Sequence, residues 1–594
     1  MRGYFLALTA LEDFWDKSSA IIFLGDWCLL NERKSSWKSL DSRLMESPFQ
    51  DASDTNDAYI YIDDIYEKIL PFIVEALNCT HQTNYSLRYW RIVIGPWLVN
   101  YIAVVYDRFV HITNALEEYP DLSTITLSEN SFIVHLDTLS FNTAVTEDLY
   151  NLQIYSKIFL FLGSKFASKS FKIKPSSCYG KPIKWSLRHS LASKYTSLCR
   201  FVSLIFFSSP VIFNNSYFSR KIEFRLLLSS FGRFIFERGS ENINLESRQY
   251  DASMREIFKK VSYKDDDFSK CLASMLFSDI PKCFVEDYQS IREIGRSKYP
   301  NTVKTIFSAN AWYSDEVFKF WSAERAENGA LLLGTPHGGT YGIRSGRNPL
   351  NHETKIVDYY YTLGWKKENC SAKVIPMPSV KLMGRKKIGA SNSKDGILLV
   401  TTCYPRYLVE PFILPTTFKK YMQWTKRFSK ALPEDLLSFL CIRPHYQDYG
   451  WNFVQRLKES IPNLKLDSWN NTFLKSLEGH RLYVCDHLST TFIEALAANK
   501  PTILFWDSKD NQLLPEAKCY FDMLRKSGIL FDSPEGAAKA IDIIYNDVES
   551  WWNDSDRQKT ISIFCDQYCR TSDNAIDLWS NEFRRIMKNQ KTEV

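Results

Sequence analysis

The sequence lacks the cysteine spacings that are typical of metal-binding and disulfide-rich proteins. Its thirteen cysteines include no C-x-x-C pair, and the closest two are Cys565 and Cys569, with no histidine-rich segment near them. These absences argue against a structural zinc site and against a disulfide framework. The N-terminus carries Glu12 and Asp13 within its apolar run and has no signal-peptide layout. We therefore expect a reducing, cytoplasmic location.

Long apolar runs and dense charge of one sign are also missing. The longest apolar runs, Ile92–Val105 and Phe201–Phe213, are shorter than a membrane span, and each contains proline. A net charge of +6 over 594 residues is mild and forms no basic stripe, which argues against nucleic-acid binding. It permits an anionic ligand. The basic stretches 165–174 and 181–200 are expected to be solvated surface or to contact the inner membrane face.

No D-x-D motif stands at the end of a predicted strand, where it would hold a divalent cation against a diphosphate. Asp265–Asp267 and Asp554–Asp556 lie in polar helical stretches and are expected to be solvated surface. The sequence therefore predicts no metal site and no cofactor.

Alternating strands and helices organise the chain from Thr302 onward. At 69.3 kDa the chain is too long for one core. Six candidate strands between 396 and 547 alternate with helices and predict a doubly wound parallel sheet. We predict a first lobe over 1–380, a linker over 381–395 within the turn-rich Pro376–Asp395, a second lobe over 396–547, and a helical tail over 548–594 that crosses back to the first lobe.

The first 300 residues are less regular. Residues 1–40 predict a helix, with Leu8, Leu11, Phe14 and Trp15 on one face, and then a strand, Ile21–Leu24. Asp26 follows that strand and either lines a cleft or marks a plain exit into a loop. Helical periodicity at 60–77 and 88–119 predicts a large helical insertion over about 41–300.

The stretch Leu482–Trp506 predicts a strand, a helix and a second strand. Such a unit places the loop Asp486–Thr491, which includes Ser489 and Thr490, at the carboxyl edge of a parallel sheet. The first amides of the helix would favour an anion there. Thr491 and Glu494 fit a capping box, which competes with a second role for Glu494 as an acceptor for a ribose diol. The alternative is an ordinary capped α/β unit without a ligand.

Two further loops follow predicted strands. His337-Gly338-Gly339 lets the backbone approach a ligand closely and offers an imidazole as a general base, or it is a glycine turn with a surface histidine. In the second loop, Arg443 and His445 are donors suited to a phosphate or diphosphate. The alternative for Arg443 is a surface ion pair with Asp448.

The chain resembles a family of transferases encoded in bacterial O-antigen and surface-polysaccharide gene clusters, and its arrangement looks like a GT-B glycosyltransferase. The segments that carry the resemblance span nearly the whole chain: LALTALEDFWDKSSAIIFLGDWC from Leu6, RYWRIVIGPWL from Arg88, FSANAWYSDEVFKFW from Phe307, PHGGTYG from Pro336, TTCYPRY from Thr401, RPHYQDYGW from Arg443 and CDHLSTTFIEALAANKP from Cys485. The resemblance implies two Rossmann-like lobes facing a cleft and sugar transfer at the inner face of the cytoplasmic membrane.

On this hypothesis a nucleotide-sugar donor binds the second lobe and a glycan or lipid-linked acceptor faces the first. His337 would deprotonate the acceptor, while Arg443, His445 and the amides after Ser489 would hold the leaving phosphate. Four residues are expected near the cleft: Asp26, Tyr404, Arg406 and Asp486. The competing hypotheses are transfer of a glycerol- or ribitol-phosphate unit from a CDP-activated donor, and a non-catalytic scaffold of polysaccharide enzymes.

Overall fold

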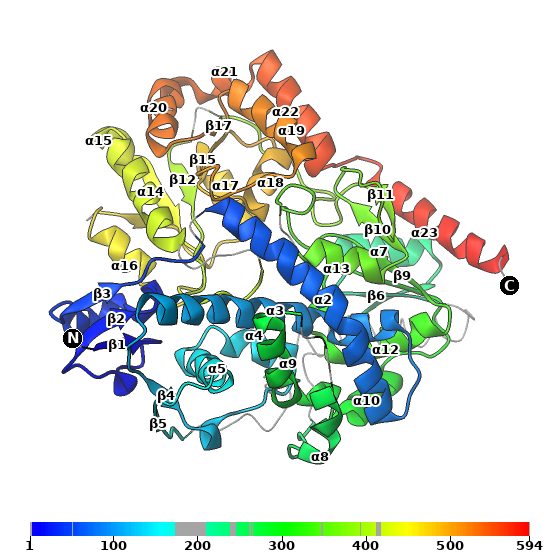
Figure 1. The fold of residues 1–594 in the computed structure, drawn as a ribbon. Coiled ribbons are helices and arrows are strands. Elements are labelled where there is room, and N and C mark those ends of the chain that lie inside the picture. Colours follow the sequence, from blue (N-terminus) through cyan, green and yellow to red (C-terminus); the bar gives the residue numbers. More distant parts are fainter. Residues whose placement is uncertain are drawn as a thin grey trace.

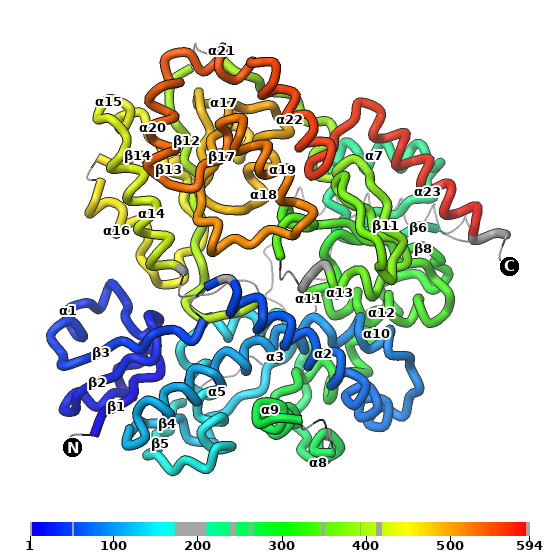
Figure 2. The backbone as a smooth tube through the Cα atoms, turned by 45° about the horizontal axis from the view of Figure 1, so that its top comes forward, coloured from blue at the N-terminus to red at the C-terminus, as the bar shows by residue number. Residues whose placement is uncertain are grey.

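The computed structural model describes residues 3–49, 51–172, 210–237, 245–260, 263, 265–345, 348–391, 394–411, 417–461 and 463–592. Every strand pairing of its named strands is parallel, and the sheets surround a group of long helices (Figures 1 and 2). A small N-terminal sheet consists of β1 (Tyr4–Ala7), β2 (Ala20–Phe23) and β3 (Ser42–Leu44). β4 (Ile125–Leu127) and β5 (Ala167–Lys169) form a pair beside it, joined through a bridge between Phe5 and Ser123.

The central sheet has six strands in the order β11-β10-β9-β8-β6-β7. Their bounds are β6 (Val211–Asn214), β7 (Phe234–Glu237), β8 (Thr305–Ser308), β9 (Leu331–Gly334), β10 (Tyr359–Thr362) and β11 (Lys373–Pro376). The inner strands are nearly continuous apolar runs, as expected for a parallel sheet that is covered on both faces.

The C-terminal sheet also has six strands, in the order β14-β13-β12-β15-β16-β17. These are β12 (Ile397–Val400), β13 (Leu440–Arg443), β14 (Lys465–Leu466), β15 (Leu482–Cys485), β16 (Thr502–Phe505) and β17 (Leu530–Phe531). This is the doubly wound order of a Rossmann-like sheet. The chain reverses direction across the sheet between β12 and β15, and ligands bind such sheets at the carboxyl ends of the strands at that switch point.

Long helices fill the space between the sheets. α2 (Ala52–His81) and α3 (Leu87–Glu118) cross the middle of the molecule, and α5 (Asp148–Phe161), α9 (Asp267–Asp279), α10 (Tyr288–Lys298) and α12 (Glu316–Glu327) pack around them (Figure 1). Among the described residues, α3 is the single helix long and apolar enough to cross a membrane. The 18-residue window that qualifies it is 89% buried within the protein, which is the pattern of a core helix.

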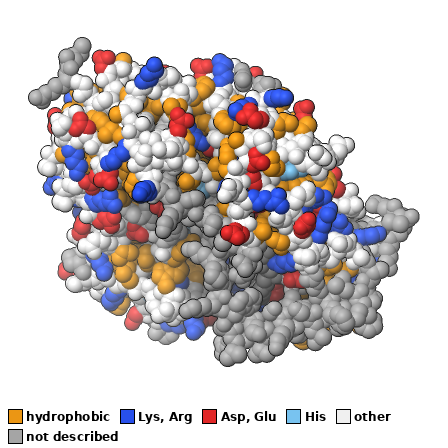
Figure 3. All heavy atoms as spheres, turned by 90° about the horizontal axis from the view of Figure 1, so that it is seen from below, with side chains coloured by type: hydrophobic (Ala, Val, Ile, Leu, Met, Phe, Trp, Pro, Cys, Tyr) orange, Lys and Arg blue, Asp and Glu red, His pale blue; other side chains and the backbone are white. Residues whose placement is uncertain are grey.

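The last helix of the C-terminal tail packs on the central sheet. The tail contains α21 (Val548–Trp552), α22 (Ser555–Tyr568) and α23 (Ala575–Thr592). Trp579 and Phe583 of α23 share a core cluster with Phe213 and Phe307 of the central sheet, and the Trp579 indole donates to the Pro378 carbonyl over 2.9 Å. Charged side chains of both signs are interspersed over the described part of the face seen in Figure 3.

The alternating strands and helices predicted from Thr302 onward are confirmed, and the C-terminal sheet is doubly wound as expected. The predicted N-terminal helix is wrong, because Tyr4–Ala7 is the parallel partner of β2 and only a short 3₁₀ turn, Glu12–Phe14, follows it. Region 41–300, expected to be a helical insertion, also contains β6 and β7 of the central sheet. The basic stretch 181–200 lies outside the described residues.

Candidate functional site

A cavity of about 770 Å³ opens at the switch point of the C-terminal sheet. One side consists of the carboxyl ends of β12 and β13 and the loop that leads from β15 into α18 (Thr490–Ala497). Thr340 and Arg344 line the cavity from the loop after β9, and α4 (Thr138–Ala144) contributes Leu139, Asn142 and Thr143. The cavity therefore lies between the C-terminal sheet and the two preceding parts of the chain.

The N-terminus of α18 supplies backbone donors to this cavity. Ser489 is the N-cap residue, and its side chain makes no capping hydrogen bond to the helix. Its hydroxyl instead contacts that of Thr491 over 2.7 Å, and Ser489, Thr490 and Thr491 all line the cavity. Uncapped amides at a helix N-terminus attract an anion. These groups therefore fit a phosphate.

The predicted capping box between Thr491 and Glu494 is wrong. The N-cap is Ser489, so the helix begins two residues earlier than the capping box requires, and the Thr491 hydroxyl accepts from Tyr483 over 2.9 Å. The carboxylate of Glu494 binds Lys381 over 2.8 Å and Arg385 over 2.6 Å. Glu494 therefore connects α18 to the chain that links the two large sheets, and both of its carboxylate oxygens are engaged by that contact.

The glycine loop after β9 touches the same helix. The Gly339 amide donates to the Thr490 hydroxyl over 3.0 Å, so the loop and the helix N-terminus are in direct contact. A Cβ at position 339 would lie 2.9 Å from the Thr490 Cα and 2.8 Å from a methyl of Ile493. Glycine is therefore required at 339 for close approach of two backbones. Gly338 lies beside it in the same turn.

Replacement of Gly339 by alanine should push the loop away from α18, because one of the two nearest obstacles, the Thr490 Cα, is backbone and cannot rotate away. We expect a loss of about 1–3 kcal/mol in the free energy of unfolding, the usual cost of overpacking. Chemical denaturation would measure it. Gly479→Ala is the matched control, since a Cβ there meets no atom within 4 Å, and an equal loss in both variants would contradict the proposed contact.

His337 is held by a buried hydrogen-bond network. Its Nδ1 lies 2.9 Å from the Tyr341 hydroxyl and 3.6 Å from Glu353, which is fully buried on α13 (Asn348–Ile356). Glu353 also accepts from Tyr313 over 2.7 Å. A carboxylate that orients a histidine is a common arrangement around a general base. The imidazole itself does not line either of the two cavities described here.

Arg443 is buried and its guanidinium is already engaged. It forms an ion pair with Asp467 and donates to the Asn471 carbonyl over 3.1 Å, and it lies 4.3 Å from the centre of the Trp469 ring. The expected alternative partner, Asp448, instead accepts from the backbone amide of Asn452 and from the first amide of α16 (Phe453–Lys458). Arg443 lines the cavity, but its charge is balanced there.

His445 lies at the rim of the cavity beside the exposed Tyr446. Its Nδ1 is 2.9 Å from the Gln447 carbonyl. Burial, together with the charge of His487, lowers the pKa of His445 below its ordinary value. His445 is therefore neutral at pH 7 and suits a hydrogen bond better than an ion pair with phosphate.

Two cations that the sequence analysis did not select face the cavity. Burial lowers the pKa of His487, but the sulfur of Cys485 and the carboxylate of Asp486, which lies 2.9 Å from the Nδ1 of His487, outweigh it and raise the pKa to about 10. His487 is therefore charged and paired with Asp486. Arg344 is half-buried and makes no hydrogen bond or ion pair through its guanidinium among the described residues. The only sequence signals were the position of His487 inside the predicted phosphate loop and that of Arg344 beside the glycine loop.

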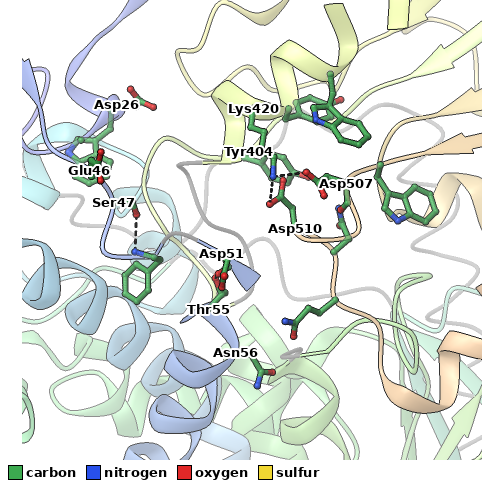
Figure 4. Close-up of a pocket in the computed structure, with 18 of the residues that line it drawn as sticks. Asp26, Glu46, Ser47, Asp51, Thr55, Asn56, Tyr404, Lys420, Asp507 and Asp510 are labelled. Carbon is green, nitrogen blue, oxygen red and sulfur yellow. Dashed lines mark hydrogen bonds and ion pairs between the residues drawn. The ribbon is translucent and has the colours of Figure 1, made fainter. Parts of the chain in front are cut away.

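A second cavity of about 420 Å³ adjoins the first, and Arg344 and Tyr404 line both. Asp26 also lines the second cavity (Figure 4), and so does Asp486. Arg406 lines neither. It is buried and binds Asp148 over 2.7 Å and the Trp27 carbonyl over 2.6 Å, so it connects the C-terminal sheet to the N-terminal part of the fold.

Metal ligands do not gather in the part of the chain that the structure describes: no group of three or more His, Cys, Asp or Glu side chains is arranged to hold an ion. Asp266 instead caps α9, and Asp554 caps α22.

Fold and site together define a parallel α/β protein with a cavity at the switch point of its C-terminal sheet. The chain belongs to the LIC12162 family of transferases, because the model of that family matches residues 4–583. A comparison with curated proteins gave no match.

Solved structures similar to the chain include a glycosyltransferase from Rickettsia africae ESF-5, with 11% identity and a TM-score of 0.35, and the glycosyltransferase SnogD from Streptomyces nogalater, with 12% identity and a TM-score of 0.31. Each match covers 64% of this chain and 100% of the other chain. Similarity of this degree does not by itself assign an activity.

Proposed function

We propose that the chain is a metal-independent glycosyltransferase of GT-B type that moves a sugar from a nucleotide-activated donor to a glycan or lipid-linked acceptor in bacterial surface-polysaccharide synthesis. The observation that carries the proposal is the cavity of about 770 Å³ in which the uncapped N-terminus of α18 meets Arg344 and His487. Such a cavity has the size of a small-molecule site and the charge to hold a diphosphate.

In the proposed reaction the acceptor hydroxyl oxygen attacks the anomeric carbon of the donor sugar. The bond from that carbon to the phosphate oxygen breaks, its electron pair leaves with the nucleotide, and the hydroxyl proton passes to a base. The amides after Ser489, the guanidinium of Arg344 and the imidazolium of His487 would stabilise the charge that develops on the departing phosphate. An acceptor carried on a lipid would bring the protein to the inner membrane face.

A thermal-shift screen against UDP-, GDP-, dTDP-, CDP- and CMP-linked sugars tests the donor site. A ligand at ~100 times its dissociation constant should raise the free energy of unfolding by about 2.7 kcal/mol. We expect one nucleotide class to give this shift and the others to give less. No shift with any of them would contradict the proposed function. Release of CMP with transfer of a polyol phosphate would instead support the phosphotransferase alternative.

A further inference from the structure

The second cavity lies between three parts of the chain. Its lining includes Gly25–Trp27 after β2, the segment Leu44–Phe49 with the first turns of α2, and the ends of β15 and β16 with α14 (Thr417–Ala431). In Figure 4 the residues of the N-terminal part, such as Ser47 and Asp51, stand on one side and Lys420, Asp507 and Asp510 on the other. Because Arg344 and Tyr404 line both cavities, a molecule bound in the second cavity would lie beside the proposed donor site.

The two cavities differ in charge. The second cavity is lined by six carboxylates and two permanent cations, Arg344 and Lys420; the carboxylates are Asp26, Glu46, Asp51, Asp486, Asp507 and Asp510. Lys420 is itself paired with Asp507 over 2.6 Å and with Asp510 over 3.0 Å. An excess of negative charge repels a nucleotide diphosphate and favours a neutral or cationic molecule. Among the described residues, the larger cavity is lined by a single carboxylate, Glu410, and by the cations Arg344, Arg443 and His487, so it has the opposite preference.

Unpaired polar groups and aromatic faces mark the second cavity as a site for hydroxylated molecules. The Tyr59 hydroxyl and the Nε2 of His111, whose side chain is more than nine-tenths buried, have no hydrogen-bond partner in the described structure. Buried polar atoms without partners are rare and point to a ligand or an ordered water. Trp424 and Trp506 add flat apolar surface to the lining of the same cavity, against which the apolar face of a sugar ring can pack.

Asp26 is placed to act on such a molecule. It begins a short 3₁₀ turn, Asp26–Cys28, at the carboxyl end of β2, and its side chain makes no hydrogen bond or ion pair in the described structure. Burial raises the pKa of Asp26, while the more distant charges of Lys419 on α14 and Arg456 on α16 oppose that effect. A carboxylate with a raised pKa is a better proton acceptor near neutral pH.

We propose that the second cavity binds the acceptor, an uncharged or amino-bearing sugar, and that the carboxylate of Asp26 takes the proton of its reacting hydroxyl. This inference rests on the proposed function, in which the acceptor oxygen forms the new bond to the anomeric carbon while the bond from that carbon to the leaving phosphate breaks. The inference makes Asp26 the general base that deprotonates the acceptor, a role that the sequence analysis predicted for His337.

The role of Asp26 is tested by measuring the kinetics of Asp26→Asn and His337→Asn. Each variant is compared with the wild-type enzyme in donor hydrolysis and in transfer to the acceptor. We expect Asp26→Asn to lower kcat at least about 100-fold with the donor KM unchanged, because a general base contributes this much. The amide is isosteric and removes a charge that burial disfavours, so the fold should persist. An Asp26→Asn enzyme within threefold of wild type, or a large loss confined to His337→Asn, would overturn the inference. Absence of donor turnover by the wild-type enzyme would contradict the proposed function itself.

The pH dependence of kcat gives an independent readout. Asp26 acts as a base only when it is ionised, so kcat should fall as pH drops through its raised pKa and recover above it. The acid limb of the wild-type profile should therefore lie above the range of an ordinary aspartate and vanish in Asp26→Asn. An unchanged acid limb in that variant would count against Asp26.

The class of acceptor is tested with three matched p-nitrophenyl glycosides: a glucoside, a glucosaminide and a glucuronide. The acidic lining should lower kcat/KM for the glucuronide at least about tenfold relative to the other two, since like charges in a shared cavity repel. Equal use of the glucuronide, or use of none of the three while water serves as acceptor, would overturn the assigned class.

Discussion

Replacing Arg344 by glutamine should lower kcat for donor turnover by about 100- to 1000-fold, the usual effect of removing one donor that stabilises developing charge. Arg344 lines both cavities and is not neutralised by an ion pair in the described structure, unlike Arg443. Its guanidinium therefore remains available to a diphosphate. The acceptor KM should change little, because the acidic cavity binds its ligand through other groups.

The measurement is steady-state kinetics with donor and acceptor varied separately. Arg427→Gln is the matched control, since Arg427 is an exposed arginine on α14 that pairs with Glu535 at the surface and lines neither cavity. It should keep wild-type kinetics. If Arg344→Gln kept a kcat within threefold of wild type, Arg344 would have no role in holding the leaving group.

Replacing Arg443 by methionine should lower the free energy of unfolding by about 3–5 kcal/mol, the effect of breaking a buried ion pair from one side. Asp467 is buried like its partner and would remain as an uncompensated carboxylate among Ser468, Asn471 and Ser476. Urea denaturation monitored by tryptophan fluorescence would measure the loss, provided that the transition remains two-state.

The double variant Arg443→Met, Asp467→Leu separates loss of the pair from loss of a ligand contact. It removes both charges, so most of the lost stability should return. If Arg443 also contacts the donor phosphate, the double variant will fold normally and bind the nucleotide weakly. Stability that stays low in the double variant would show that the pair is not the cause.

The C-terminal sheet could be predicted from the sequence because its signals are local. Ile397–Val400 and Leu482–Cys485 are short apolar runs bounded by polar turns, and the sheet forms with those runs in the expected places. β1 could not be predicted in this way. Tyr4–Ala7 is stabilised by Ala20–Phe23 and by Ser123, and no pattern within the first 15 residues indicates those partners.

The candidate site, too, could be predicted only where its signals are local in the sequence. The loop Asp486–Thr491 and the glycine loop were found because backbone donors and glycines leave a local trace. Arg443 looked like a phosphate ligand because its partner Asp467 lies 24 residues away and becomes visible only in the folded chain. Arg344 carried no motif of its own, and its place between two cavities depends on packing of three distant segments.

The position of α23 has a consequence for the order in which the protein can form during synthesis. Trp579, Phe583 and Met587 complete the apolar layer over β6 and β8, whose residues leave the ribosome hundreds of codons earlier. Until α23 emerges, Phe213 and Phe307 lack the part of their cover that Trp579 and Phe583 supply. The apolar layer on this face of the central sheet can therefore be completed only after α23 has been synthesised, and the nascent chain exposes apolar surface that favours aggregation until then.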